Sequence, residues 1–288
     1  MKTTFDIKRF MSFMKYEFMG ESKRWIRGMI GFSIALACVY VINLYIKKDA
    51  LMDCVMGHVK FEEWSYDPFY WFYNNLAGMT LFVWIGMTFA AACNIFKNMG
   101  TKQQRISFLA LPASNLEKYL ARLIWVNGSY LVTFIVGFAV ADACLALASL
   151  SFGLGVQGSV MATFFGTIGE DNGATLNVNG VPMPIYYLWI GIISLLLFIH
   201  SSWTFFGTLF RKNAWLWTMG VCVVVIVLLV KLEEINDDKL QYMLDNWGVH
   251  TTYWLNVSLL LCCAFLLYFS AYRLFKGMQV INNKWVNL

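Results

Sequence analysis

Charge is scarce in this chain of 288 residues, of which only 14% are Asp, Glu, Lys or Arg. In ordinary soluble domains about a quarter of the residues are charged. Apolar residues make up 59% of the sequence and aromatic residues 17%. The low charge excludes an ordinary soluble domain and indicates that lipid surrounds most of the chain.

The sequence also lacks the motifs of nucleotide, zinc and acyl-transfer chemistry. It has no Gly-x-x-x-x-Gly-Lys-Ser/Thr phosphate loop, no Gly-x-Gly-x-x-Gly turn after a strand, no His-Glu-x-x-His pair and no Gly-x-Ser-x-Gly elbow. The histidines are only three, His58, His200 and His250, and are too dispersed to predict a metal site. The seven cysteines fit neither a disulfide framework nor metal spacing. We therefore expect no catalytic residue, metal or cofactor in this chain.

Six segments with little or no charge are long enough to cross a bilayer. A hydrocarbon core of about 30 Å needs about 20 apolar residues in a helix. Helices are expected because lipid offers no partner to free backbone groups, and because the segments lack the alternation of barrel strands. We predict an all-α integral membrane protein that forms a single transmembrane domain over residues 1–288. Its predicted spans are 28–46, 68–96, 115–150, 185–210, 213–231 and 252–274.

The distribution of Lys and Arg predicts the orientation of these spans. If the N-terminus is cytoplasmic, the inner segments carry 17 basic and 4 acidic residues, and the outer segments carry 5 basic and 12 acidic residues. Basic residues concentrate on the cytoplasmic side of membrane proteins. Both termini are therefore expected inside, in a multi-pass protein of the cell (inner) membrane. We interpret the net charge of +5 as this topology signal together with attraction to membrane lipids, not as nucleic-acid binding.

The N-terminal segment 1–27 has the pattern of an amphipathic helix. Ile7, Phe10, Met14 and Phe18 recur at steps of three or four, with charged residues between them. A basic amphipathic helix before a first span is expected to lie in the inner headgroup layer. The alternative is a plain charged leader.

The connection 97–114, between the second and third spans, is the most specific local feature. Residues 101–110 form a short amphipathic segment that Leu111 and Pro112 interrupt. Ser114 and Glu117 then have the spacing of a capping box at the start of the next helix. The pattern predicts a short helix held flat on the cytoplasmic face between two membrane helices.

The outer segment 151–184 contains no Lys or Arg and allows two interpretations. Residues 175–178 can form a small hairpin with Val181 onward, with prolines that confine the returning strand to an edge. The apolar residues 160–168 can instead dip into the membrane as a re-entrant helix. A seventh span here would move five basic residues to the outside, which the charge distribution opposes.

Three polar residues within or close to the spans are candidates for a pathway: Asn94, Asp142 and His200. Asp142 is either a relay or substrate contact or an acid near the outer boundary that reaches water. The second interpretation is favoured because Asp142 is the twentieth residue of a helix counted from Leu123. His200 is expected to bond a neighbouring helix in preference to relaying protons.

Together, the amphipathic N-terminal helix, the six spans and the stretch Arg105-Ile106-Ser107-Phe108-Leu109-Ala110-Leu111-Pro112-Ala113-Ser114-Asn115-Leu116-Glu117 resemble the short bacterial six-span permease subunits of type-2 ATP-binding-cassette (ABC) exporters. In that family this loop holds the coupling helix, which docks on the partner ATPase. The resemblance implies a translocation path formed with a second permease copy or paralogue, and ATP bound and hydrolysed by separate cytoplasmic ATPase subunits. It assigns the ATPase contact to Gln104, Arg105, Phe108, Leu109, Leu111, Pro112, Ser114 and Glu117.

Two other functions are compatible with the sequence. One is an intramembrane lipid-modifying enzyme, which would need polar residues clustered at one interface. Only Asp142 and His200 are available for such a cluster in the spans, and they lie on different helices at different depths. The other is a membrane scaffold or sensor subunit that transports nothing.

Overall fold

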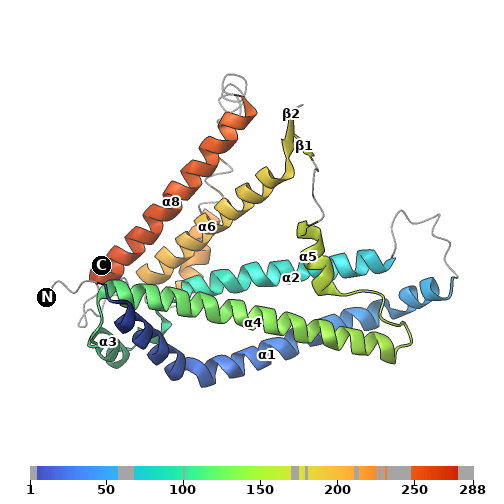
Figure 1. Ribbon diagram of the computed structural model, residues 1–288, viewed down its shortest axis with the longest axis horizontal. Helices are drawn as coiled ribbons and strands as arrows, with labels where there is room; N and C mark the ends of the chain where they lie inside the picture. The colour runs from blue at the N-terminus through green and yellow to red at the C-terminus, as the bar shows by residue number, and fades with distance from the viewer. Residues whose placement is uncertain are drawn as a thin grey trace. The chain divides into compact units, whose positions relative to one another are not determined.

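The computed structural model describes residues 5–57, 68–99, 101–169, 175–178, 181–210, 214–224, 227, 231 and 248–277. Most of this part of the chain is helical (Figure 1). Among the described residues, five helices are long enough and apolar enough to cross a membrane, which indicates a multi-pass membrane protein. They are α1 (Ile7–Val55), α2 (Pro68–Cys93), α4 (Asn115–Ser151), α6 (Ile185–Leu209) and α8 (Val249–Gly277).

The predicted span 213–231 has no helix of membrane-spanning length among the described residues. A shorter apolar helix, Ala214–Val224, occupies its first half. Most of its second half lies outside the described residues, as do residues 58–67 and 232–247 of the predicted outer segments. The six-span topology therefore stays a prediction.

The first helix differs from the prediction of an interfacial helix (1–27) followed by a separate span (28–46). The structure has one helix, α1, which at 1.5 Å per residue is about 74 Å long. No proline interrupts residues 7–55, and glycine is tolerated inside a helix at a cost of about 1 kcal/mol. The helix therefore continues from the charged part into the apolar part.

The face of α1 that packs inside the chain also differs from the expected apolar face. Phe10, Phe13 and Glu17 are buried, whereas Ile7 and Phe18 are exposed. The sequence pattern identified an apolar face correctly, but that face is largely directed away from the rest of the chain.

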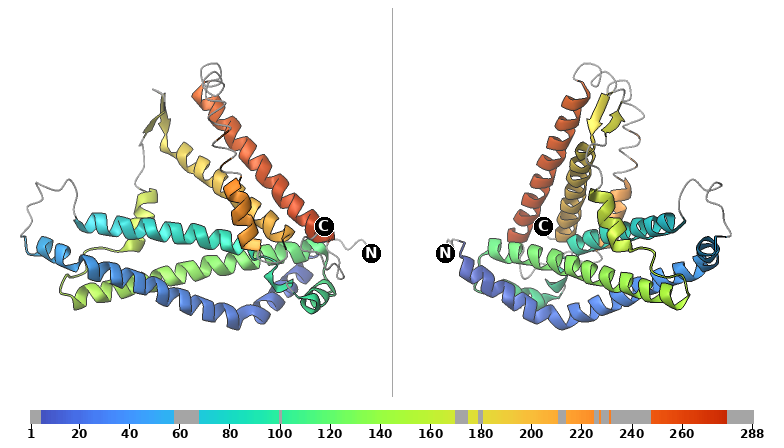
Figure 2. Two further views of the ribbon diagram at one scale, coloured as in Figure 1. Left: turned by 180° about the vertical axis from the view of Figure 1, so that it is seen from behind. Right: turned by 45° about the vertical axis from the view of Figure 1, so that its right-hand side comes forward.

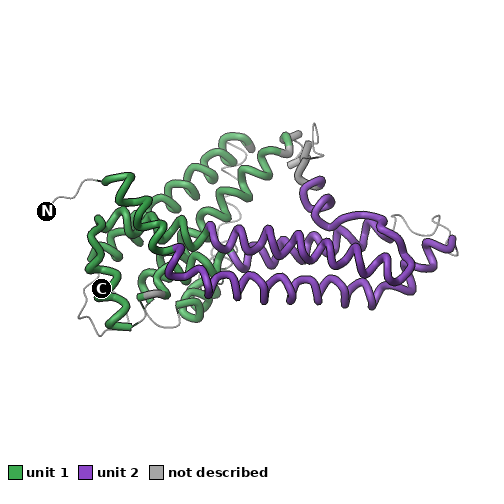
Figure 3. Tube along the Cα trace, turned by 60° about the horizontal axis from the view of Figure 1, so that its bottom comes forward, with its two compact units in different colours: residues 1–17, 88–127, 173–288 green, residues 18–87, 128–172 purple. Residues whose placement is uncertain are grey.

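The chain divides into two compact units (Figure 3). The single transmembrane domain expected over residues 1–288 stays a prediction. Unit 1 comprises residues 1–17, 88–127 and 173–288, and unit 2 comprises residues 18–87 and 128–172. Helices α1, α2 and α4 each contribute residues to both units.

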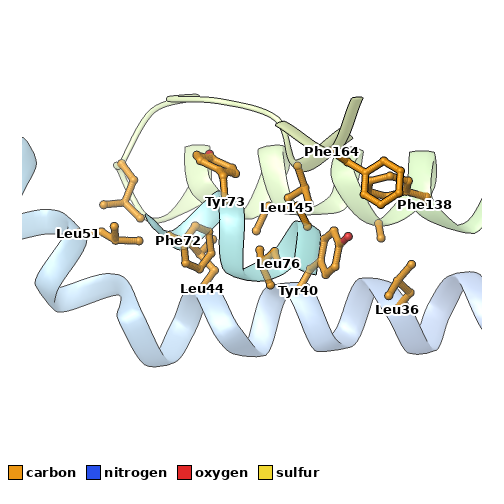
Figure 4. Packing of buried hydrophobic residues seen from close by; sticks show 14 of the residues in the cluster. Leu36, Tyr40, Leu44, Leu51, Phe72, Tyr73, Leu76, Phe138, Leu145 and Phe164 are labelled. Carbon is orange, nitrogen blue, oxygen red and sulfur yellow. The ribbon is translucent and has the colours of Figure 1, made fainter. Parts of the chain in front are cut away.

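Unit 2 packs α1, α2, α4 and the short helix α5 (Val160–Gly169) around one apolar core. Figure 4 shows how Leu44 of α1, Leu76 of α2, Leu145 of α4 and Phe164 of α5 gather there. Between helices in lipid the drive to hide apolar surface is weak, so close packing and hydrogen bonds hold them together.

Hydrogen bonds also join helices within unit 2. The hydroxyls of Tyr40 and Thr80 bond each other between α1 and α2. The indole N–H of Trp25 donates to the carbonyl oxygen of Ser129 at 3.0 Å and to the hydroxyl of Thr133 at 2.8 Å, which fixes α1 on α4.

The segment between α4 and α6 contains both a helix and a hairpin. Helix α5 is followed by the antiparallel strands β1 (Thr175–Val178) and β2 (Val181–Pro184), with Val178 opposite Val181. The predicted hairpin is therefore present. Re-entry of residues 160–168 into a membrane stays a prediction.

In unit 1, α6 and α8 lie side by side, as the views in Figures 1 and 2 agree. The hydroxyl of Tyr253 donates to the carbonyl oxygen of Tyr187 at 2.6 Å and joins them near one end. Gly207 of α6 contacts the backbone at the end of α2. A Cβ atom added at position 207 would lie 2.6 Å from the carbonyl oxygen of Cys93. Only glycine allows this approach.

Replacing Gly207 with alanine should therefore destabilise the protein by about 1–3 kcal/mol, because backbone atoms cannot move aside as a side chain can. The measurement is thermal or denaturant unfolding of the purified protein in detergent. Gly86→Ala is the control, since a Cβ there meets nothing within 4 Å. Equal stability of the two variants would contradict the close approach.

Candidate functional site

A short helix, α3 (Lys102–Leu109), lies between α2 and α4, as the sequence predicted. It begins with a capping box: the amide N–H of Gln104 donates to the Thr101 hydroxyl, and the amide N–H of Thr101 donates to the Gln104 side chain, both at 3.2 Å. The Thr-x-x-Gln spacing of residues 101–104 is the sequence pattern of a capping box, but this cap was not among the predictions. These two bonds satisfy two of the four backbone N–H groups that lack a partner within the helix at its beginning.

The capping box predicted at the start of α4 is confirmed. The amide N–H of Ser114 donates to the Glu117 carboxylate at 2.8 Å, and the amide N–H of Glu117 donates to the Ser114 hydroxyl at 3.3 Å. This arrangement ends the turn after α3 and fixes where α4 starts.

The Glu117 carboxylate also binds the beginning of α1. The Arg9 guanidinium donates to its two oxygens at 2.6 and 2.7 Å, in the two-pronged geometry of a strong ion pair, and the amide N–H of Asp6 donates at 2.8 Å. The Glu117 side chain is fully buried. Glu117 precedes Leu123, the first residue of the long uncharged stretch of α4.

Two cations of α4 extend this set of contacts. Lys118 donates to the carbonyl oxygen of Leu109 at 2.7 Å, which satisfies a free carbonyl at the end of α3. Arg122 donates to the carbonyl oxygen of Ile95, just after α2, and to the Glu17 carboxylate of α1, both at 2.6 Å. Both side chains of the Arg122–Glu17 pair are only 3% exposed.

Aromatic side chains fill the space beside these ionic contacts. The Phe108 ring of α3 packs edge-on against two other rings. Its centroid lies 5.7 Å from that of Phe13 in α1 and 6.3 Å from that of Phe275 in α8. The Phe275 ring also stacks on the Phe96 ring, with a centroid-to-centroid distance of 4.9 Å. We call the contacts of Arg9, Glu17, Phe108, Glu117, Lys118, Arg122 and Phe275 the α3 node. It joins α3 to α1, α4, α8 and the residues that follow α2.

Three of the residues predicted to contact an ATPase have buried side chains. Arg105, Phe108 and Glu117 are buried within unit 1, so their side chains do not form its surface. The family resemblance assigned these residues to the contact, whereas in the structure they lie on helix faces that pack inward. Of the other predicted residues, Gln104 and Pro112 are exposed, and Leu109, Leu111 and Ser114 are half-buried. The exposed face of α3 is formed by Lys102, Gln103, Gln104, Ile106 and Ser107.

His200 joins three helices of unit 1, which agrees with its predicted bonding to neighbouring helices. Its Nε2 lies 3.0 Å from the side-chain oxygen of Asn127 in α4, and its Nδ1 lies 2.5 Å from the hydroxyl of Tyr268 in α8. The Asn127 amide donates to the carbonyl oxygen of Leu123, so its oxygen is the acceptor toward His200. His200 is therefore protonated at Nε2 and accepts at Nδ1 from Tyr268.

Asp142 and Asn94 have local hydrogen-bond partners. The Asp142 carboxylate accepts from the Ser159 hydroxyl at 2.5 Å and from the amide N–H of Val160 at 2.8 Å, so it holds the start of α5 in unit 2. The Asn94 amide donates to the carbonyl oxygen of Ala90, one turn back, at 2.7 Å.

Comparison of the chain with family models, with curated proteins and with solved structures gives no match. Within the part of the chain that the structure describes, no group of three or more His, Cys, Asp or Glu residues is placed to hold a metal ion. Of the predicted site residues, Phe108 and Glu117 belong to the α3 node. Their arrangement can transmit force between a surface helix and several long helices.

Replacing Arg122 with methionine should destabilise the protein by about 3–5 kcal/mol, because Glu17 is then left buried without its cation. The double variant Glu17→Gln, Arg122→Met should regain most of this loss, since a neutral pair needs no compensating charge. Unfolding in detergent measures both, with Lys102→Met on the exposed face of α3 as the control. A double variant that is no more stable than the single one would contradict the buried pair.

Proposed function

We propose that the chain is the transmembrane subunit of an ATP-driven exporter of the type-2 ABC class in the cell (inner) membrane. It forms the translocation path with a second permease chain and receives energy from separate cytoplasmic ATPase subunits. The observation that carries the proposal is the α3 node: a surface helix of eight residues is tied through buried ionic and aromatic contacts to long apolar helices.

The stiffness of the α3 node supports a role in coupling. Hydrogen bonds stabilise both ends of α3. Thr101 and Gln104 cap its start, and Lys118 donates to the carbonyl oxygen of Leu109 at its end. Close-packed interiors move as rigid bodies instead of deforming continuously. A displacement of α3 would therefore be passed directly to the start of α4, the start of α1 and the end of α8.

The position of the α3 node supports access by a cytoplasmic partner. It gathers the beginnings of α1 and α4 with the ends of α2 and α8, and the distribution of Lys and Arg assigns all four of these helix ends to the cytoplasm. An ATPase that docks on α3 would thus meet four membrane helices at one place.

The contact with the ATPase is assigned to the exposed face of α3. Ile106 is 45% exposed there and is surrounded by the polar residues Lys102, Gln103 and Ser107. A single apolar residue within a polar rim is the usual anatomy of a small protein contact. Phe108 packs on the opposite side of α3, against Phe13 and Phe275, and so fixes the orientation of this face.

The test is Ile106→Glu in the complex isolated from native membranes and reconstituted in liposomes. A charge in the desolvated centre of the contact should reduce ATPase association and stimulated ATP hydrolysis at least about tenfold, equivalent to about 1.4 kcal/mol. The protein itself should keep its stability, because the side chain points away from the α3 node.

Val156→Glu is the matched control, since Val156 is likewise exposed, at 56%, but lies between α4 and α5. It should leave ATP hydrolysis unchanged. A native protein that repeatedly isolates without any ATPase would refute the exporter proposal. Unchanged hydrolysis with Ile106→Glu would refute the assigned contact.

A further inference from the structure

We propose that the part of α1 in unit 2 binds an anionic phospholipid at Lys23, Arg24 and Arg27. The lipid phosphate would lie among these cations, and one acyl chain would follow the adjoining helix face. This inference requires that α1 enters a membrane, but it is independent of the exporter function.

The rotation of α1 directs the three cations outward. Trp25 is fixed on α4 by its two indole hydrogen bonds, and Ser33 and Leu36 are buried on the packed side of the helix. Lys23, Arg24 and Arg27 are exposed. Their position is thus set by the packing of unit 2 and does not depend on side-chain flexibility.

The three cations crowd one turn of the helix. Lys23 and Arg27 are four residues apart and Arg24 and Arg27 are three apart, which places their Cβ atoms about 5–6 Å from each other. Arg27 folds back along the helix, with its Nε donating to the carbonyl oxygen of Lys23 at 3.2 Å. The nearest carboxylate in the sequence, Glu21, is half-buried. Like charges at this spacing destabilise a helix, and a bound anion would relieve the repulsion.

The level of these cations matches that of lipid headgroups. The uncharged stretch of α1 begins at Gly28, directly after Arg27, and continues to residue 46. Basic residues at such a boundary are attracted to the negative surface of the cytoplasmic leaflet. A phosphate at this depth would be within reach of all three side chains.

The adjoining face of α1 can receive an acyl chain. A Cβ at Gly28 or Gly31 would meet nothing within 4 Å, and Gly31 follows Arg24 by seven residues and Arg27 by four, on the same face. Ile30 and Ile34 stand beside this face and are 52% and 59% exposed. Together they form a shallow apolar strip that begins at the cations.

The charge also argues for a lipid over a second copy of the chain on this face. In a symmetric pair the same patch is present on both partners, so packing this face on itself would bring two sets of three cations together. An anionic lipid has the opposite charge and the apolar tail that the adjoining strip fits.

The test is native mass spectrometry of the purified protein titrated with phosphatidylglycerol or with phosphatidylcholine of the same acyl chains. The native protein should retain phosphatidylglycerol more tightly. Each neutralised cation, as in Arg24→Gln or Arg27→Gln, should weaken this binding about fivefold, the factor expected for one basic residue at a membrane surface. The triple variant with Lys23→Gln should bind both lipids equally.

The control variant carries Lys97→Gln, Lys102→Gln and Lys276→Gln, three exposed lysines of unit 1, and should keep the native preference. Gly31→Leu, which fills the strip without an internal clash, should weaken both lipids. Equal losses in the two triple variants, no preference in the native protein, or no effect of Gly31→Leu would overturn the proposal. So would a triple variant that changes the oligomeric state of the protein instead of its lipid binding. If the triple variant does not fold, the two single arginine variants decide.

Discussion

The Glu117 carboxylate accepts hydrogen bonds from the Arg9 guanidinium, from the amide N–H of Asp6 and from the amide N–H of Ser114. The first two belong to the beginning of α1 and the third belongs to the turn after α3. Because Glu117 is itself in the first turn of α4, one buried side chain determines where three elements meet. A charge can be buried this way only when all of its acceptor sites are used. The arrangement of unit 1 around α3 depends on that condition.

Polar contacts also organise the rest of the protein. In lipid, apolar surface gains little by moving from tails to another helix, so the pairing of helices relies on hydrogen bonds and close fits. Trp25 with Thr133, His200 with Asn127 and Asp142 with Ser159 each join two elements within one unit. The apolar side chains make a helix suited to a lipid environment, whereas these few polar groups determine which other helices it packs against.

Much of the helix order could be predicted from sequence, because charge-free length and local capping act within short stretches. The Ser114 and Glu117 capping box, the start of α2 at Pro68 and the hairpin from Thr175 are of this kind. The burial of Glu17, Arg105 and Phe108 could not be predicted in the same way. Periodicity shows that a helix has an apolar face, but not whether lipid, another helix or a partner covers it. Glu17 and Arg122 are 105 residues apart in sequence, and nothing local in either stretch indicates the other.

The separation of Arg9 and Glu117 along the chain, 108 residues, has a consequence for biosynthesis. Arg9 and Glu17 leave the ribosome long before Glu117 and Arg122 do, so both must stay hydrated while α1 and α2 are inserted. During that interval the charged start of α1 is kept out of the hydrocarbon by its own solvation energy. The ion pairs Arg9–Glu117 and Glu17–Arg122 can form only after the beginning of α4 has been synthesised. Their formation therefore requires that the first half of the chain is assembled in the correct order.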